Sequence, residues 1–387
     1  MILHAWRFML MCPLLLACGT EGGVELTAKE AFGKLLFFDR NLSLESNQSC
    51  STCHLREAGW SGDDSAINAH GACSMKWPDN TEEFCTGDGG NLALSREQRA
   101  VIDREYDQIA LSIAAYEASP EVNSYTSKFD YFLAGLVPLT PEENLGLLVF
   151  GEKGRFANCH VVEQGPNGEP PLFTDFTFDN LGVPRNPENP WYTMPASFNP
   201  DGTRWLDLGL GEFLASRADY RQFAQENDGM QKVPTLRNVD RRPTPNFIKA
   251  YMHNGYFKTL KGVVHFYNTR DVKATCKNPL TREADAIADN CWPEPQVKNN
   301  VNKSELGNLG LTEAEELALL GLCRLYPTIS NRRRGSSALP PACARLHWIN
   351  DIGESMKGGS NARLSWSADE SSASKSLPTC WNRSQEA

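Results

Sequence analysis

The chain has 387 residues, of which 41% are hydrophobic, so it contains enough apolar material for two compact domains. Its formal net charge of −10 argues against a nucleic-acid partner and is compatible with a basic redox partner. Beyond the first residues, no stretch of the sequence is long and apolar enough to cross a membrane. Contact with a membrane is therefore expected only through an N-terminal lipid anchor.

The N-terminus has the layout of an export signal. Arg7 precedes a short apolar run over residues 8–16, and an Ala-Cys-Gly sequence centred on Cys18 follows. This ending is typical of a lipoprotein signal, in which the cysteine is acylated and becomes the mature N-terminus. The alternative is an ordinary cleaved signal with an incidental cysteine. We predict that residues 1–18 are a signal peptide and that the protein is in the periplasm or cell envelope, with lipid anchoring at Cys18 if the first interpretation holds.

Two segments repeat along the chain. Helices are expected to begin at Thr27 and Thr140, because each Thr has a Glu three residues later, the capping-box pattern that satisfies free amides at a helix start. Aligning these segments also pairs Gly33 with Gly146. Each is followed by a loop that ends in Cys-His, at Cys53-His54 and at Cys159-His160. The repeat predicts two related domains.

The remaining elements are also mainly helical. Capping boxes place helix starts at Ser95 and Thr312, and residues 109–116 have the small, apolar character of a packed helix. Strand signals are sparse, and long Pro-, Gly- and Asn-rich connections fill much of 165–210 and 270–310. The predicted fold class is mostly α with long irregular loops.

Residues 50–54, Cys-Ser-Thr-Cys-His, carry the strongest chemical signal. Two thiols separated by two residues can add to both vinyl groups of one porphyrin, and the next residue places an imidazole beneath the iron. A redox CxxC would need a βαβ setting, and half of a zinc site would need a second Cys/His pair nearby; neither is evident. The motif therefore predicts a covalent heme c held by Cys50 and Cys53, with His54 as an iron ligand.

The second motif, Arg-Phe-Ala-Asn-Cys-His at residues 155–160, has Phe156 where the first thiol should stand. One thioether from Cys159 and iron coordination by His160 are still sufficient to hold a heme. The alternatives are an empty site or a weakly held heme. We expect a second heme, because the sequence around the motif has the character of a domain that houses a large apolar cofactor.

Other cysteines suggest disulfides. Twelve cysteines are many for a cytosolic enzyme, but in an exported protein some of them can form disulfides. Cys276 and Cys291 lie in a polar, Pro- and Asn-rich stretch and could close a loop in an oxidising compartment, as could Cys73 and Cys85. Spacing alone proves neither bridge.

Several longer motifs occur in order along the chain. They are Gly-Lys-Leu-Leu-Phe-Phe-Asp at 33–39, Lys-Val-Pro-Thr-Leu-Arg-Asn-Val at 232–239, Ala-Tyr-Met-His-Asn-Gly at 250–255 and Val-Val-His-Phe-Tyr-Asn at 263–268. With the motif at 49–54, they resemble the bacterial diheme cytochrome c peroxidase family, which includes the related enzyme that matures methylamine dehydrogenase. The resemblance covers 27–70 and 109–322 and implies two cytochrome c-like domains with one heme each.

The resemblance implies a domain plan and an activity. Residues 27–135 would form a shortened N-terminal heme domain and residues 140–325 a C-terminal heme domain, and the Ser-, Arg- and Pro-rich tail over 326–387 would be poorly ordered. The implied oxidoreductase reduces hydrogen peroxide with electrons passed between two hemes, supplied by a small electron-donor cytochrome or cupredoxin. The alternatives are an electron-transfer cytochrome without peroxidase activity and an inactive, degenerate family member. A calcium ion and a homodimer remain open.

The resemblance also implies which residues bind the heme irons. His54 and His160 would be the proximal ligands. Tyr267 takes the distal position of the C-terminal domain, where peroxidases usually have Met and the methylamine dehydrogenase-maturing enzyme has Tyr; a phenolate there would stabilise oxidised iron. The alternative is an ordinary core aromatic. His70 matches a distal His that must leave before peroxide reaches the iron, or else is an exposed loop residue.

Four further residues in the motifs have weaker or structural assignments. Met252 and His265 are secondary ligand candidates, and His265 is expected to face solvent or a heme propionate. His253 and Arg237 are expected to be structural or to contact a propionate.

One part of the family pattern is missing. Residues 72–92 lack the Arg-Asn-Ala-Pro and Trp-Asp-Gly-Arg motifs and the acid that moves a proton between the peroxide oxygens. Glu82 and Glu83 lie nearby, but no pattern fixes either above the iron, and neither Trp60 nor Trp77 is a secure replacement for the family's inter-heme tryptophan. The sequence therefore leaves the catalytic residues unassigned.

Overall fold

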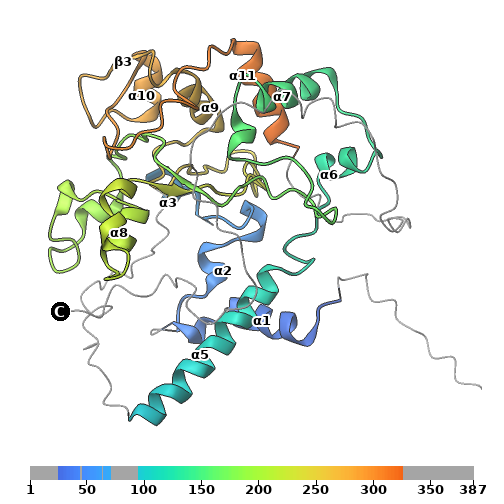
Figure 1. Ribbon diagram of the computed structural model, residues 1–387, viewed down its shortest axis with the longest axis vertical. Coiled ribbons are helices and arrows are strands. Elements are labelled where there is room, and N and C mark those ends of the chain that lie inside the picture. The colour runs from blue at the N-terminus through green and yellow to red at the C-terminus, as the bar shows by residue number, and fades with distance from the viewer. Residues whose placement is uncertain (1–24, 44–45, 63, 71–94, 326–387) are drawn as a thin grey trace, which may run out of the picture.

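The computed structural model describes residues 25–43, 46–62, 64–70 and 95–325. In these ranges the chain is mostly helical with little sheet, which confirms the predicted class (Figure 1). No helix in these ranges is long and apolar enough to span a bilayer. The predicted signal peptide, the Cys73–Cys85 pair, Glu82, Glu83, Trp77 and the predicted tail lie outside the described residues.

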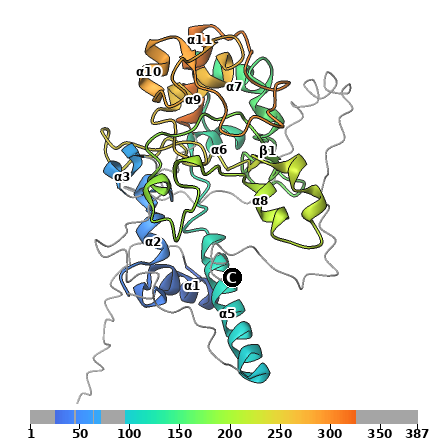
Figure 2. The same cartoon turned by 90° about the vertical axis from the view of Figure 1, so that its left-hand side faces the viewer.

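Helices α1 (Ala28–Phe38), α2 (Cys50–Cys53) and α5 (Arg96–Glu117) gather at one end of the molecule, as both views show (Figures 1 and 2). Helix α6 (Lys128–Leu133) lies with the C-terminal elements instead, where Phe129 is part of their core. The capping boxes predicted at Thr27 and Ser95 are present, with each hydroxyl accepting from the backbone amide three residues on. The elements are α1 (Ala28–Phe38), η1 (Arg40–Leu42), α2 (Cys50–Cys53), η2 (Arg56–Ala58), α3 (Ser65–His70), α5 (Arg96–Glu117) and α6 (Lys128–Leu133).

The C-terminal elements form the other, larger end. The predicted capping boxes at Thr140 and Thr312 are also present. The helices are α7 (Pro141–Gly151), η3 (Phe156–Asn158), η4 (Pro190–Thr193), η5 (Gly202–Arg204), α8 (Leu210–Ala215), η6 (Arg221–Phe223), η7 (Gln225–Asn227), α9 (Leu260–Thr269), α10 (Glu283–Ala288) and α11 (Glu313–Cys323).

Four two-residue strands form two small ladders among the described residues. The strands β1 (Phe178–Asp179) and β2 (Gln231–Lys232) pair antiparallel, with Phe178 opposite Lys232. The strands β3 (Ala274–Thr275) and β4 (Cys291–Trp292) pair in parallel. Beside this second ladder, Cys276 and Cys291 form a disulfide, one of the two bridges that the sequence allowed.

A crossing helix pair recurs at both ends of the molecule. Helix α1 packs on α5, and α7 packs on α11. In each pair the first helix has a glycine at the contact: a Cβ at Gly33 would overlap the backbone oxygen of Ser112, and a Cβ at Gly146 would overlap that of Ala318. The two glycines that align in the sequence repeat therefore occupy equivalent positions, because only a residue without a side chain lets the helix backbones approach so closely.

Replacing Gly33 with Ala should therefore destabilise the protein although alanine is the better helix former. We expect a loss of about 1–3 kcal/mol, as for other overpacked contacts. The matched control is Gly151→Ala, at the end of α7, where an added Cβ would meet no atom within 4 Å. This control should be neutral or stabilising by about 0.5–1 kcal/mol. Urea unfolding of both variants measures the difference, and equal midpoints would contradict the tight crossing.

Two buried clusters fill the C-terminal end. One joins α7, α9 and α11 and includes Phe150, Phe173 and Leu322. The other surrounds Phe257 and the disulfide. Residues near the second Cys-His motif are divided between them: Phe156, Ala157 and Leu236 pack on the first cluster, and Met252, Val263 and Tyr267 pack on the second. The motif therefore lies where the two clusters meet.

Candidate functional site

The first motif forms a short helix with its histidine at the end. Helix α2 contains both thiols, and His54 is its C-terminal cap. The Nδ1 atom of His54 lies 2.9 Å from the backbone oxygen of Trp60. Because a carbonyl oxygen only accepts, Nδ1 carries the proton and Nε2 keeps the lone pair that a metal requires.

A tight loop places the Trp60 carbonyl at this point. The Trp60 amide donates to the Leu55 oxygen at 2.8 Å, and Leu55 and Ser61 form an antiparallel bridge. Trp60 adopts a left-handed conformation with φ of 62°. Its indole packs edge-on against Phe37 and Tyr116, so the α1–α5 pair fixes the loop.

Glu117 is a neighbour of the first motif that the sequence did not identify. Partial desolvation raises the pKa of its carboxyl group, and the nearby His54 opposes this shift. Burial, followed by the charge of Glu117, raises the pKa of the Cys50 thiol. Glu117 directly follows the predicted helical residues 109–116, but only the α1–α5 crossing brings it to the motif.

The second motif opens into a cavity of about 640 Å³. His160 is 8% exposed, and its Nδ1 donates to the backbone oxygen of Phe173 at 2.8 Å, so Nε2 is again the atom with a free lone pair. Burial lowers the pKa of His160, although backbone hydrogen bonding opposes the shift. The walls also include Cys159, Phe156, Leu236, Val239, Met252, His253, Leu260, Val263 and Tyr267.

This cavity fits a porphyrin in size and chemistry. Its volume is within the range of pockets that hold cofactors, about 300–1,000 Å³. It combines apolar walls with the Cys159 thiol and the His160 imidazole, which are the groups that attach a c-type heme. Tyr267, the predicted distal ligand, lies in the wall, and burial raises the pKa of its hydroxyl.

Phe156 fills the position of the missing thiol with an aromatic ring. The ring stacks on Tyr267 with centroids 5.1 Å apart and on Phe150 with centroids 5.5 Å apart. The substitution therefore replaces a covalent anchor with an apolar contact that joins the motif to the core.

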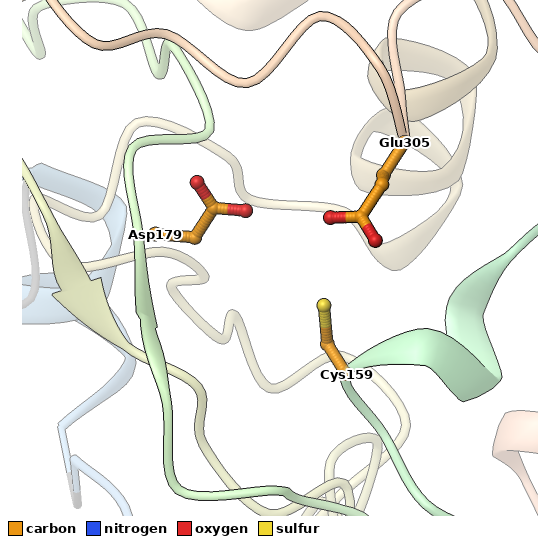
Figure 3. Close-up of side chains that lie close together, drawn as sticks. All are labelled: Cys159, Asp179 and Glu305. Atoms are coloured by element: carbon orange, nitrogen blue, oxygen red, sulfur yellow. The ribbon is translucent and has the colours of Figure 1, made fainter. Parts of the chain in front are cut away.

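Cys159 also faces two carboxylates. Its Sγ and carboxylate oxygens of Asp179 and Glu305 lie within 4.8 Å of one another, and Figure 3 shows the three side chains directed toward a common space. The side-chain amide of Asn302 donates to Asp179 at 2.5 Å and to Glu305 at 2.8 Å. Such a set can bind a divalent cation, but its sulfur is the same atom that the second motif offers to a porphyrin.

The other residues singled out in the sequence have varied surroundings. His70 ends α3, and its side chain lies outside the described residues. Met252 and His253 line the second cavity, and His253 Nε2 lies 3.2 Å from the Gln296 side-chain oxygen. Arg237 forms a bidentate ion pair with Asp130.

The expectation that His265 faces solvent or a propionate is wrong. Its Nδ1 lies 3.0 Å from Glu316, on α11. Glu316 is buried and also accepts from Asn268, so the packing of α9 on α11 directs the imidazole away from the cavity and into a polar contact between helices.

Comparisons with known proteins agree with this geometry. The family model described as "Di-haem cytochrome c peroxidase" matches residues 27–86. The methylamine utilization protein MauG of Paracoccus denitrificans is 31% identical over 235 residues, which are 60% of this chain and 53% of MauG. The cytochrome-c peroxidase IdrP1 of Denitromonas iodatirespirans is 26% identical over 292 residues, with 62% and 72% covered. These similarities support the diheme cytochrome c peroxidase and MauG family for this chain.

Members of this family are redox enzymes with two c-type hemes. The chain spans about half of the length of Paracoccus MauG. The diheme peroxidase BthA of Burkholderia thailandensis matches the fold with a TM-score of 0.52 at 22% identity, covering 82% of this chain and 92% of BthA. That likeness concerns the fold alone.

Proposed function

We propose that this protein is an exported c-type diheme oxidoreductase that reduces hydrogen peroxide. The observation that carries the proposal is the repeated Cys-His arrangement, in which a backbone carbonyl holds Nδ1 of His54 and of His160 and leaves each Nε2 available to iron. The cavity at the second motif supports it, because its size and donor groups suit a porphyrin.

The first heme would be held by both thiols of α2. Cys50 and Cys53 would form the thioethers, and His54 would be the proximal ligand, with His70 as the candidate distal ligand. The Trp60 carbonyl would fix the orientation of the His54 ring and make it more basic.

The second heme would be held by Cys159 through a single thioether. His160 would be its proximal ligand and Tyr267 its distal ligand, and both side chains line the cavity. Phe156 would pack against the porphyrin edge in place of a second bond. An oxygen ligand at the distal position favours higher oxidation states of iron, which is why Tyr267 suits a site that stores oxidising equivalents.

The bound hemes would supply the iron that binds peroxide and the redox centres that carry its two electrons. Reduction of one peroxide to two waters consumes two electrons and two protons. We propose that the electrons come from a small electron-donor cytochrome or cupredoxin, for which the negative net charge would favour a basic partner.

The remaining predictions form part of the same proposal. Residues 27–135 and 140–325 would be two cytochrome c-like heme domains, which the recurring helix crossings at Gly33 and Gly146 support. Export would follow from the signal over residues 1–18, with lipid anchoring at Cys18 or simple cleavage as the two outcomes. Calcium binding and dimerisation stay open.

An electron-transfer cytochrome without peroxidase activity is the second candidate. The observation that favours it is the lack of the Arg-Asn-Ala-Pro and Trp-Asp-Gly-Arg motifs and of the associated acid over residues 72–92. An inactive family member is the third.

The test is to express the full chain in a host with a c-type maturation system and to measure covalent heme per protein. We expect a ratio near two, followed by peroxide-dependent spectral changes and oxidation of a reduced donor cytochrome. Reversible heme reduction with no response to peroxide would instead establish the electron-transfer candidate, and hemes that exchange no electrons with a donor would identify an inactive protein. A protein without covalent heme would overturn all three.

A further inference from the structure

The loop that follows the first motif docks on the C-terminal half of the molecule. Lys249 is only 4% exposed, and its ammonium donates to the backbone oxygen of Ala58 at 2.7 Å across 191 sequence positions. It also donates to the backbone oxygen of Arg241 at 3.1 Å. One buried cation therefore joins carbonyl groups from both halves.

Neighbouring contacts hold the same two segments together. The Asn68 side chain donates to the Ile248 oxygen at 3.0 Å, and the Ile248 amide donates to the Ser65 hydroxyl at 2.9 Å. Gly59 has a φ of 75°, and a Cβ there would lie 2.6 Å from the Asn238 oxygen. The docking is therefore close, and it requires glycine at this point.

This docking connects the two Cys-His motifs. The loop over residues 55–62 carries the Trp60 carbonyl that accepts from His54. Lys249 and Trp60 also line the cavity that contains His160. Lys249 therefore contacts the loop that orients the His54 imidazole and is itself part of the wall around His160.

We propose that Lys249 is a positioning residue that couples the two sites, because its ammonium fixes the 55–62 loop and thereby the Trp60 carbonyl that orients His54. The coupling weakens when the ammonium loses its proton, because charge-assisted hydrogen bonds become ordinary ones. The inference rests on the proposed function only in taking His54 as an iron ligand.

The surroundings of Lys249 place its deprotonation in an accessible pH range. Desolvation lowers the pKa of Lys249 from 10.5 to about 8; Arg242 and Arg241 add to the shift, and Asp240 opposes it. Tyr251 is hydrogen-bonded to both Asp240 and Arg242. On the loop side, the charged neighbours are Arg56 and Glu57, which act on Arg241.

Two pH effects of opposite sign follow. Because the folded pKa lies below the unfolded one, between about pH 8 and 10.5 the unfolded state binds more protons through this lysine, so its contribution to the free energy of unfolding increases with pH. The hydrogen bond from Lys249 to the 55–62 loop weakens over the same interval, because the amine loses its charge. Above pH 8 the loop should therefore open more often, while Lys249 causes no decrease in the free energy of unfolding. This combination identifies the effect of Lys249.

The experiment compares wild-type holoprotein with Lys249→Met. The matched control is Lys258→Met. Lys258 is a half-buried lysine that also donates to a backbone carbonyl, that of Gly255, but it does not contact the loop. Heme content is measured first, because a protein without heme would contradict the proposed function and not the coupling. Hydrogen exchange of the 55–62 peptide and the reduction potential and electron paramagnetic resonance spectrum of the first heme are then followed from pH 7 to 9.

We expect wild-type exchange, corrected for its intrinsic pH dependence, to rise around pH 8 together with a change in the spectrum of the first heme. Lys249→Met should show roughly tenfold faster loop exchange at pH 7, the order contributed by one charge-assisted hydrogen bond, with no further step at pH 8. The control should behave as wild type. Unchanged loop exchange, or faster exchange with an unchanged heme spectrum and potential, would overturn the coupling. The wild-type pH series decides the question even if Lys249→Met does not fold.

Discussion

Replacing Cys159 by alanine should lower the covalent heme content of the protein from near two to near one. With Phe156 in the other position of the second motif, Cys159 is its one thiol, so the substitution leaves the porphyrin without a bond to the chain. Acid–acetone extraction followed by heme quantification on the denatured protein measures the loss directly.

Two further variants test whether the loss of heme is specific to the thiol of the second motif. Cys323→Ala removes a buried free thiol from the C-terminal core that does not line the cavity, and it should retain both hemes. Phe156→Cys restores the missing thiol and should convert the second heme to two thioethers, seen as a shift of its pyridine hemochrome band. A Cys159→Ala protein that keeps two covalent hemes would show that the second heme is attached elsewhere.

Replacing Arg237 by alanine should give the largest loss of stability among the ion pairs of the described residues. Its guanidinium makes two hydrogen bonds of 2.8 Å to Asp130, and both side chains are only 9% exposed. It also stacks over the rings of Tyr125 and Phe173. Removing one partner of a buried pair leaves an uncompensated charge, which costs about 3–5 kcal/mol. Urea unfolding measures this cost.

The matched control is Lys153→Ala at the surface. Lys153 pairs with Glu315 at 2.7 Å, but its side chain is 43% exposed and solvent screens the interaction. Its loss should cost at most about 1 kcal/mol. Similar unfolding midpoints for the two variants would mean that Asp130 finds a new partner or becomes hydrated when Arg237 is removed.

Several features were determined by the sequence alone because the interactions behind them are local. The helix starts at Thr27, Ser95, Thr140 and Thr312 were predicted correctly, since a capping box needs only a hydroxyl and a side-chain acceptor three residues apart. The predicted heme motif at residues 50–54 is local for the same reason, because the proposed chemistry depends on spacing within one helical turn. The disulfide was a pairing that the sequence permitted and the structure confirmed.

The tertiary structure alone decided what surrounds these groups. Nothing local predicts that Lys249 reaches the carbonyl of Ala58, that Glu117 lies near Cys50, or that Asp179 and Glu305 converge on Cys159. His265 was misassigned because its partner, Glu316, is 51 positions away on another helix. Contacts of this kind are set by how helices cross and loops dock. The sequence therefore identified the candidate heme-binding groups, and the packing determined how each of them is oriented and connected.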